Sequence, residues 1–421
     1  ARCNLIFMYF CTQTSHIPTK GLLTLLTLLV FSLSLTAQSS GLEFEIDETY
    51  QGDSLTMLSI EEVVITATRN KFNVISPMPT QLLQGKELEK LNSLSVADAI
   101  RYFSGVQLKD YGGVGGIKTI NVRSLGSAHT AVFYDGMTVG NAQNAQVDLS
   151  KYSLDNIEAI ELYNGQKSSI FQPARGFFSS NSLYLRSKTP RFEKDEKNHI
   201  RAAFKTGSFG LLNPSILYQQ KITSDLSLSA SAELVDAHGR YKYRYKKEGG
   251  YDTTAVRQNG DIRSLRTELT FYLMNKNIGK ASLKGYMYNS ERGLPGAIVA
   301  NRFSHNQRQW DRNIFVHASL ENSFFKNHGL LANIKFSRDY NRYVDPEYVT
   351  LEGALDNRYY QSEWYASLVN KYSIANWWEA SLATDFSKNT LSANLYRFPY
   401  PTRYSYFVAL STQMQWERLH I

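Results

Sequence analysis

The chain has 421 residues, which is long enough for more than one domain. Its net charge is +8, and 43% of its residues are hydrophobic. Tyr and Phe number 27 and 22, yet the mean hydropathy is only −0.34. This composition favours a protein that crosses a membrane with alternating strands, and a soluble β-rich protein is the alternative. Basic and acidic residues are interspersed, without a basic helix or an aromatic RNA-binding motif, which argues against nucleic acid as a partner.

The longest apolar run covers residues 21–37 and ends at a small residue. This is the form of a secretory signal peptide, with cleavage expected after Ala37. A transmembrane anchor is the alternative, for which the run is short, since a spanning helix needs about 20 residues. Because the chain does not begin with Met, we expect translation to start at Met8, so residues 1–37 are interpreted as a signal peptide with upstream residues.

The part that follows the leader is expected to lack thiol chemistry, because Cys3 and Cys11 both lie in the segment that would be removed. Residues 38–59 are polar and acidic and predict a flexible linker. Residues 61–68 then form a β-prone run, Glu-Glu-Val-Val-Ile-Thr-Ala-Thr. Such a run on a flexible arm can add as a strand to the edge of a partner's sheet. An ordinary first strand of the next domain is the alternative.

Residues 117–163 predict a compact α/β module of short apolar strands linked by Asn, Gly and Asp turns. Asp135 and Gly136 stand between two apolar runs, which is a strong hairpin signal. The expected strands lie around Ile120, over 131–134 and over 157–162.

A helical pattern precedes this module over residues 85–105, with Ser95 before a run of apolar residues at helical spacing and Gly105 as the closing glycine. The glycine-rich stretch 107–116 does not have the spacing of a phosphate-binding loop. We interpret it as a flexible loop, and a structural turn is the alternative.

From about residue 199 the hydrophobic period changes to two, which predicts about ten transmembrane barrel strands with apolar residues outward and polar residues inward. Short and long connections alternate, so the long ones are expected outside the cell. The basic run 238–251 falls in one of these, where it could meet anionic lipopolysaccharide or ligand, unless it is simply a solvated loop. The expected strands are 199–207, 211–221, 226–236, 263–274, 280–289, 311–324, 329–340, 361–373, 376–387 and 403–416, and the expected long connections are 237–262, 290–310, 341–360 and 388–402.

Five short motifs occur in one order: IEEVVITATRN, an Ala-Asp-Ala-Ile helix ending in SGV, INVRSLGS, VFYDGM and LDNIEAIEL. In this order they resemble the plug domain of TonB-dependent outer-membrane receptors. The resemblance covers residues 60–190 by motif and the remainder by pattern. The segment NAQNAQVDLSKYSLDNIE is most similar to the cobalamin-receptor-like members. The chain departs from the family between Asn164 and Leu183, where an arginine-glycine-proline and a small-residue strand are usual.

The resemblance implies an α+β plug domain followed by an antiparallel transmembrane β-barrel. Residues 60–190 would be the TonB box and plug domain, and residues 199–421 the N-terminal part of the barrel. Family barrels close with about twenty-two strands, and about ten cannot close around a plug. An unclosed edge in lipid leaves backbone groups unsatisfied. We therefore interpret the chain as a fragment, with a small ten-stranded pore as the alternative.

The resemblance also implies site residues. In the family the β-prone run is the Ton box that the periplasmic domain of TonB binds, and the apical plug loops contact the ligand. Arg123 and Glu161 would be buried, paired charges that hold the plug together or against the barrel. The TonB-binding residues would be Glu62, Val63, Val64, Ile65 and Thr66. The ligand-binding residues would be Tyr111, Gly112, Gly113, Asn141, Gln143, Asn144 and Gln146.

The function implied by the resemblance is energy-coupled import of a scarce ligand, with cobalamin favoured, across the bacterial outer membrane. A siderophore or haem receptor of the same fold, and a passive surface-binding protein, are the alternatives. Beyond the leader, the sequence has no G-x-S-x-G motif, no H-E-x-x-H motif and no cysteine cluster, so we expect no enzyme. No cofactor or metal is expected, and the expected partners are TonB, a small molecule and outer-membrane lipid.

Overall fold

The computed structural model describes residues 80–140, 146–167, 169–193, 196–247, 251–298, 305–325, 327–350, 353–416 and 419–420. The expected signal peptide, the linker and the Ton box residues Glu62, Val63, Val64, Ile65 and Thr66 lie outside them. None of the helices within the described part is both long enough and apolar enough to span a membrane.

The N-terminal part is a small α/β unit built on a five-stranded sheet of order β1-β6-β7-β4-β5. The β4–β7 pair is parallel and the other pairs are antiparallel. The three strands predicted from the sequence are therefore confirmed as β3, β4 and β6. The bounds are β1 (Thr80–Gln84), β4 (Thr130–Tyr134), β5 (Met137–Val139), β6 (Ile157–Tyr163) and β7 (Asn181–Ser187), with a separate antiparallel hairpin of β2 (Val106–Asp110) and β3 (Lys118–Val122).

The predicted helix over 85–105 is present as two short helices, α2 (Gly85–Lys90) and α3 (Val96–Ile100). The chain turns between them at Asn92, whose φ of 44° ends the first helix. Ser95 stands at the start of the second, as predicted, and its hydroxyl donates a hydrogen bond to Asp98. Short 3₁₀ turns complete the unit at Gly113–Gly115, Ser127–His129, Leu149–Lys151 and Ala174–Phe178.

The Asp135-Gly136 turn is the hairpin that the sequence predicts. It joins β4 to β5, with Tyr134 paired to Met137. Asp135 and Gly136 have φ values of 47° and 81°, as a type I′ turn requires. This turn points the Asp135 carboxylate at the amide and hydroxyl of Ser187 on β7, which both donate to it.

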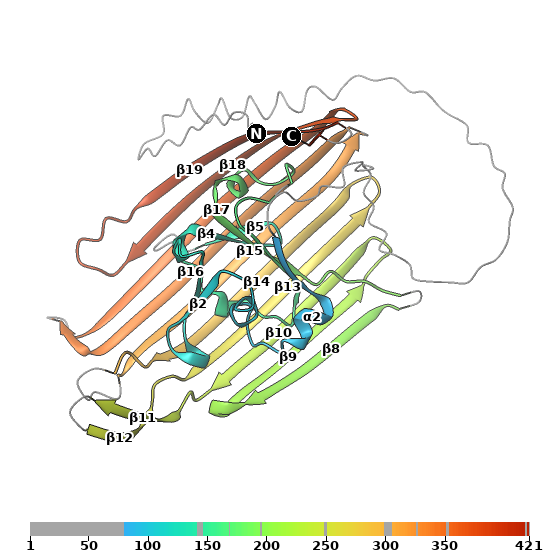
Figure 1. Ribbon diagram of the computed structural model, residues 1–421. Coiled ribbons are helices and arrows are strands. Elements are labelled where there is room, and N and C mark those ends of the chain that lie inside the picture. The colour runs from blue at the N-terminus through green and yellow to red at the C-terminus, as the bar shows by residue number, and fades with distance from the viewer. Residues whose placement is uncertain are drawn as a thin grey trace.

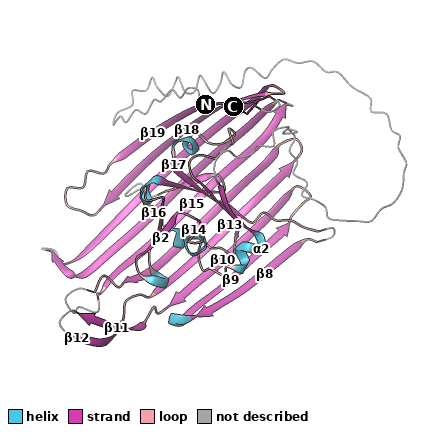
Figure 2. Ribbon diagram, in the orientation of Figure 1, coloured by secondary structure: helices cyan, strands magenta, loops and turns pink. Residues whose placement is uncertain are grey.

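The remainder is one large antiparallel sheet in which strands follow each other in chain order, with the small unit lying against one face (Figures 1 and 2). The ten predicted strands are all confirmed, and a two-residue strand, β20, follows them. Their bounds are β8 (Asn198–Gly207), β9 (Leu211–Lys221), β10 (Leu226–Ala237), β13 (Ile262–Asn275), β14 (Gly279–Leu294), β15 (Gln307–Phe325), β16 (His328–Thr350), β17 (Gly353–Ala375), β18 (Trp378–Ala393), β19 (Thr402–Trp416) and β20 (Leu419–His420).

The predicted long connections are wrong in extent. Most of 341–360 belongs to β16 and β17, which are 23 residues each. The span 237–262 contains a separate hairpin of β11 (Tyr241–Lys247) and β12 (Tyr251–Arg257). The strands continue because backbone pairing does not require an apolar face once the chain leaves the apolar band. Likewise, 107–110 is strand β2 rather than loop.

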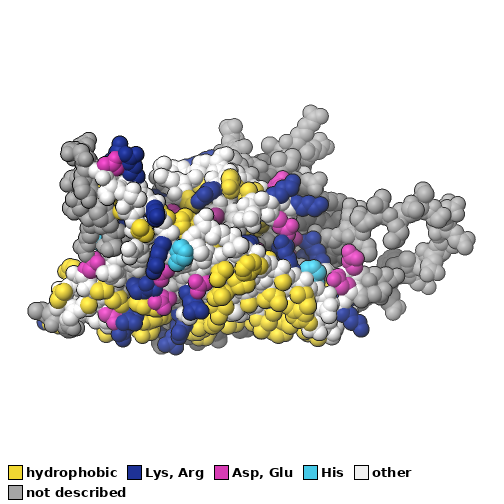
Figure 3. Space-filling view, turned by 90° about the horizontal axis from the view of Figure 1, so that it is seen from below, with side chains coloured by type: hydrophobic (Ala, Val, Ile, Leu, Met, Phe, Trp, Pro, Cys, Tyr) yellow, Lys and Arg dark blue, Asp and Glu magenta, His cyan; other side chains and the backbone are white. Residues whose placement is uncertain are grey.

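The two faces of the sheet differ as the alternation predicts. Along β13 the side chains of Leu265 and Leu269 are exposed outward, while Arg266 and Glu268 are buried inward. Hydrophobic side chains gather on one side of the molecule, seen in Figure 3. The main apolar core lies within the N-terminal unit, around residues such as Ile100 and Leu162, and the β14 and β15 aromatics Tyr286, Tyr288 and Phe315 pack onto it.

Candidate functional site

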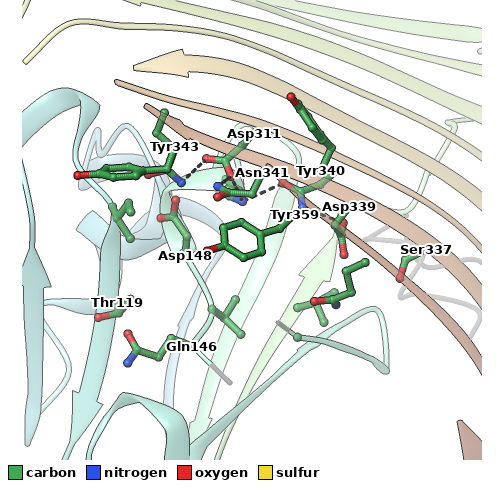
Figure 4. A pocket seen from close by; sticks show the side chains of 18 of the residues that line it. Thr119, Gln146, Asp148, Asp311, Ser337, Asp339, Tyr340, Asn341, Tyr343 and Tyr359 are labelled. Atoms are coloured by element: carbon green, nitrogen blue, oxygen red, sulfur yellow. Dashed lines mark hydrogen bonds and ion pairs between the residues drawn. The ribbon is translucent and has the colours of Figure 1, made fainter. Parts of the chain in front are cut away.

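A cavity of about 600 Å³ lies between the N-terminal unit and the inward face of strands β14 to β18. It is at the end of the sheet that carries the longer connections, because residues around 294–296 and 307 border it. A volume of roughly 300–1,000 Å³ is typical of small-molecule sites. Figure 4 shows the side chains that line it. They include Tyr111, Thr119, Gln146, Asp148, Lys151, Tyr152, Asp311, Asn313, Ser337, Asp339, Asn341, Tyr343, Asn357, Tyr359 and Gln361.

The lining combines aromatic rings with amides and carboxylates. Two of the amides are oriented by carboxylates, because Asn341 donates to Asp311 at 2.8 Å and Asn313 donates to Asp339 at 2.7 Å. Fixed amides and tyrosines can hydrogen-bond a polar ligand and stack against its flat or apolar parts. The cavity is therefore suited to a polar organic molecule rather than to a bare ion.

The base of the cavity is a buried charge network that joins the two units. The Arg292 guanidinium on β14, fully buried, lies 3.3 Å from Asp148 of the N-terminal unit and 3.2 Å from Asp311 on β15. Lys151 adds a contact of 3.5 Å to Asp311. Burial lowers the pKa of Lys151, but the carboxylates of Asp311 and Asp148 outweigh burial and raise it, so Lys151 is charged.

A second network fixes the Asp135-Gly136 turn to the sheet. The Lys284 ammonium lies 2.5 Å from Asp135 and 3.4 Å from Glu268. The Tyr134 hydroxyl donates to Glu268 at 2.5 Å. Burial raises the pKa of Asp135, but the Lys284 charge and the hydrogen bonds from Lys284 and Ser187 outweigh it and leave this pKa below its ordinary value.

A third network holds the segment around Arg175. Its guanidinium lies 3.2 Å from Glu363, which Lys335 also contacts at 2.7 Å. The backbone amide of Arg175 donates to Asp385 at 2.8 Å, and its guanidinium donates to Ser387 at 2.7 Å. These contacts reach strands β16 to β18, so the N-terminal unit is tied to the sheet along much of its width.

The structure brings two of the predicted ligand-binding residues, Tyr111 and Gln146, to the cavity wall. The neighbouring Gly112 and Gly113 form the tip of the β2–β3 hairpin, where their amides donate to Asp110 at 3.0 and 2.8 Å. The Asp110 carboxylate therefore holds the tip in a defined turn. The other predicted ligand residues, Asn141, Gln143 and Asn144, lie outside the described residues.

The two residues predicted as buried, paired charges, Glu161 and Arg123, have different surroundings in the structure. Glu161 on β6 accepts a hydrogen bond from Tyr163 at 2.9 Å and lies 3.8 Å from Lys167, so it is paired within the N-terminal unit. Arg123 is exposed, where a buried position was expected. Its φ of 50° places it in a turn whose amide donates to the carbonyl of Gly105, and this turn directs the side chain to the surface.

Sequence reasoning missed part of the wall, because Asn341, Tyr343, Asn357 and Tyr359 lie in strand segments that were predicted as a connection. The alternation of inward and outward residues in the predicted strand continues there, since Asn341 and Tyr343 follow Asp339 at a spacing of two. In the described part of the chain, no group of three or more His, Cys, Asp or Glu side chains could hold a metal ion.

Comparison with known proteins found a matching family profile and similar proteins. Residues 74–176 match the sequence profile of the TonB-dependent Receptor Plug Domain. The vitamin B12 transporter BtuB of Vibrio vulnificus is 24% identical over 251 residues, covering 58% of this chain and 37% of that protein. Its counterpart in Photobacterium profundum is 31% identical over 113 residues, covering 26% of this chain and 18% of that protein. The chain thus spans well under half the length of these relatives.

Solved structures share the fold. The copper transporter OprC superposes with a TM-score of 0.60 at 11% identity, covering 80% of this chain and 53% of that one. The ferric enterobactin receptor of Pseudomonas aeruginosa, solved with enterobactin, superposes with a TM-score of 0.58 at 12% identity, covering 80% and 56%. The N-terminal unit is therefore a plug domain, and the large antiparallel sheet matches the barrels of these receptors. Residues 74–176 therefore form the plug domain of a TonB-dependent receptor, and the chain is similar to such receptors, among them the vitamin B12 transporters BtuB.

Proposed function

We propose that this protein is an active importer of the bacterial outer membrane that takes up a scarce organic ligand through the cavity between plug and sheet. The observation that supports this most directly is the cavity itself, which is walled by the plug residues Tyr111 and Gln146 and by tyrosines and amides of β15 to β17. A ligand held there contacts plug and sheet together, so its binding can change how the plug is seated.

Cobalamin is our first candidate ligand, because the sequence relatives are named vitamin B12 transporters. A ferric siderophore is the second, because one structural neighbour was solved with enterobactin. Haem is the third candidate, because a haem receptor of the same fold is one of the alternatives that the sequence leaves open. The cavity's amides and tyrosines suit any ligand rich in hydrogen-bonding groups. The family is one of transporters and receptors, and we propose no catalytic role and no resident cofactor.

The outer-membrane location rests on the outward apolar face of the sheet and on the family. In this orientation the short turns are periplasmic and the cavity opens toward the outside. Residues 62–66 are our proposed TonB-binding segment, which ligand binding would release into the periplasm. TonB would then use inner-membrane energy to remodel the plug.

Uptake measurements in cells test energy coupling against passive surface binding. The variant Val64→Pro removes a ladder donor from the Ton box and should abolish uptake while ligand binding to cells persists. Ser54→Pro in the linker is the matched control and should leave uptake unchanged. Collapse of the proton gradient should reproduce the Val64→Pro result. Uptake that is indifferent to both treatments would support a passive binding protein instead.

A further inference from the structure

The outward face of the sheet carries a hollow of about 400 Å³. Tyr340 borders both this hollow and the ligand cavity, and the two arginines of the hollow do not line the cavity. Its lining residues stand on three neighbouring strands: Arg312 and Ile314 on β15, Arg338 and Tyr340 on β16, and Tyr360 on β17. Successive side chains of a strand point to opposite faces. The residues that alternate with them, such as Asp311 and Asp339, line the inner cavity.

The strand register brings the two arginines to one place. Arg312 is paired with Tyr340, and Ile314 is paired with Arg338. The arginines are therefore diagonal neighbours, whose Cβ atoms are expected about 7–8 Å apart. The Tyr340 and Tyr360 rings lie beside them with centroids 4.9 Å apart. Two guanidinium groups thus flank one small hollow with an aromatic border.

The charge of this surface is not balanced. Arg312 and Arg338 are both exposed, and neither forms an ion pair with any residue that the structure describes. The next outward arginines, Arg342 and Arg358, share the single carboxylate of Asp356 at 2.8 and 2.7 Å. The strands β15 to β17 therefore present more cation than anion here, and the hollow is complementary to an anionic group.

The position of the hollow along the strands indicates which kind of molecule binds there. Arg338 follows ten residues after His328, where β16 begins beside a short turn. A membrane-spanning strand needs about 9–11 residues, so Arg338 is at the far boundary of the apolar band. The outward apolar residues Val316 and Ile334 lie on the near side of it, 47% and 60% exposed. Arginine costs little at such a boundary and much at mid-membrane.

We propose that this hollow binds a phosphate group of lipopolysaccharide in the outer leaflet, an inference that rests on the proposed outer-membrane location. Arginine forks match phosphate oxygens in a bidentate manner, which fixes the headgroup as well as attracting it. The tyrosine rings pack against the sugar to which the phosphate is attached, and the acyl chains lie along the apolar residues below. The site anchors the receptor laterally and is separate from ligand uptake.

Native mass spectrometry of the detergent-purified protein tests this proposal. The titrants are lipid A with two phosphates, the same lipid A without phosphates, and inorganic phosphate as a competitor. Wild type should bind the phosphorylated lipid, and R312Q/R338Q should weaken this binding about tenfold or more, because both charge-assisted contacts are lost. R312K/R338K keeps the charge without the fork and should lie between the two.

Arg263→Gln is the matched control, because Arg263 also faces outward but lies 3.4 Å from Asp236, so its charge is already paired. It should bind lipid A as wild type does. The proposal is overturned if R312Q/R338Q binds lipid A like wild type, if dephosphorylated lipid binds equally well, or if millimolar inorganic phosphate displaces the lipid. Heat-modifiable mobility on gels establishes that each variant is folded. Titration of the import ligand should be the same in all variants, so failure here is distinguishable from failure of the proposed function.

Discussion

The ammonium of Lys284 on strand β14 lies 2.5 Å from the carboxylate of Asp135 in the β4–β5 turn of the plug. The lysine side chain is 1% exposed, and Glu268 also contacts it. The type I′ turn, which local sequence specifies, therefore positions the charge that couples the plug to the sheet. Discrete polar contacts of this kind hold the plug against the sheet, and the proposed remodelling of the plug would have to break them.

Substitution of Lys284 by Met should loosen the plug. It leaves Asp135 and Glu268 as uncompensated charges in a buried place, which costs on the order of 3 kcal/mol. Urea unfolding of the purified protein, followed by hydrogen exchange of the plug amides, should show an earlier transition than wild type. Lys276→Met, in the exposed turn between β13 and β14, is the control and should change little. Equal transitions for the two variants would contradict a role of Lys284 in seating the plug.

Acid should loosen the plug in a defined way. The pKa of Asp135 is lowered in the folded protein. Burial raises the pKa of Asp155, but the hydrogen bonds from Lys205 and Ser215 outweigh burial, so this pKa is lowered as well. A lowered folded pKa gives stability that is present above the ordinary value of 3.8 and lost as the pH falls through the folded value.

The free energy of unfolding should therefore fall between about pH 5 and about pH 1, measured by urea titration. The double variant D135N/D155N should be less stable at the upper pH and should lose less between the two. An unchanged pH dependence in this variant would show that other groups carry the acid sensitivity. Low ionic strength should not be needed to see the effect, because buried pairs are weakly screened.

Gly136→Ala tests the turn itself. A Cβ at Gly136 meets no atom within 4 Å, but φ is 81°, so the cost is conformational and should be about 1–2 kcal/mol. Gly140→Ala is the matched control, because a Cβ there also meets no atom within 4 Å and φ is not in the left-handed region. Thermal unfolding should rank wild type and Gly140→Ala together, above Gly136→Ala. The reverse ranking would mean that the plug tolerates a different turn.

The sequence predicted the elements well wherever one physical signal dominated. Strand β9 was predicted with its observed bounds, because an alternating run there is closed by turn residues at both ends. The Asp135-Gly136 turn was predicted because few residues adopt positive φ at two successive positions. The helix over 85–105 was predicted as one element because its apolar spacing gives no sign of the break at Asn92.

The site was harder to predict, because part of its wall is made by backbone pairing beyond the apolar band. Strand β16 was expected to end near Tyr340, where the outward residues cease to be apolar, but it continues to Thr350. Asn341 and Tyr343 line the cavity from this extension. Long-range pairs such as Arg292 with Asp148 depend on the docking of plug to sheet, which no local pattern encodes.

Calorimetric titration of the detergent-purified protein tests the central claim most directly, with cobalamin, haem and a ferric siderophore as parallel titrants. We expect a saturable isotherm with cobalamin, or with an iron chelate if the ligand class is different. Tyr111→Ala and Tyr343→Ala should weaken it about tenfold or more by removing aromatic contacts in the cavity. Tyr396→Ala, in a connection where this side chain is 86% exposed, should bind as wild type does. Absence of saturable binding with all three titrants, or equal affinity in the cavity variants, would contradict a ligand site between plug and sheet.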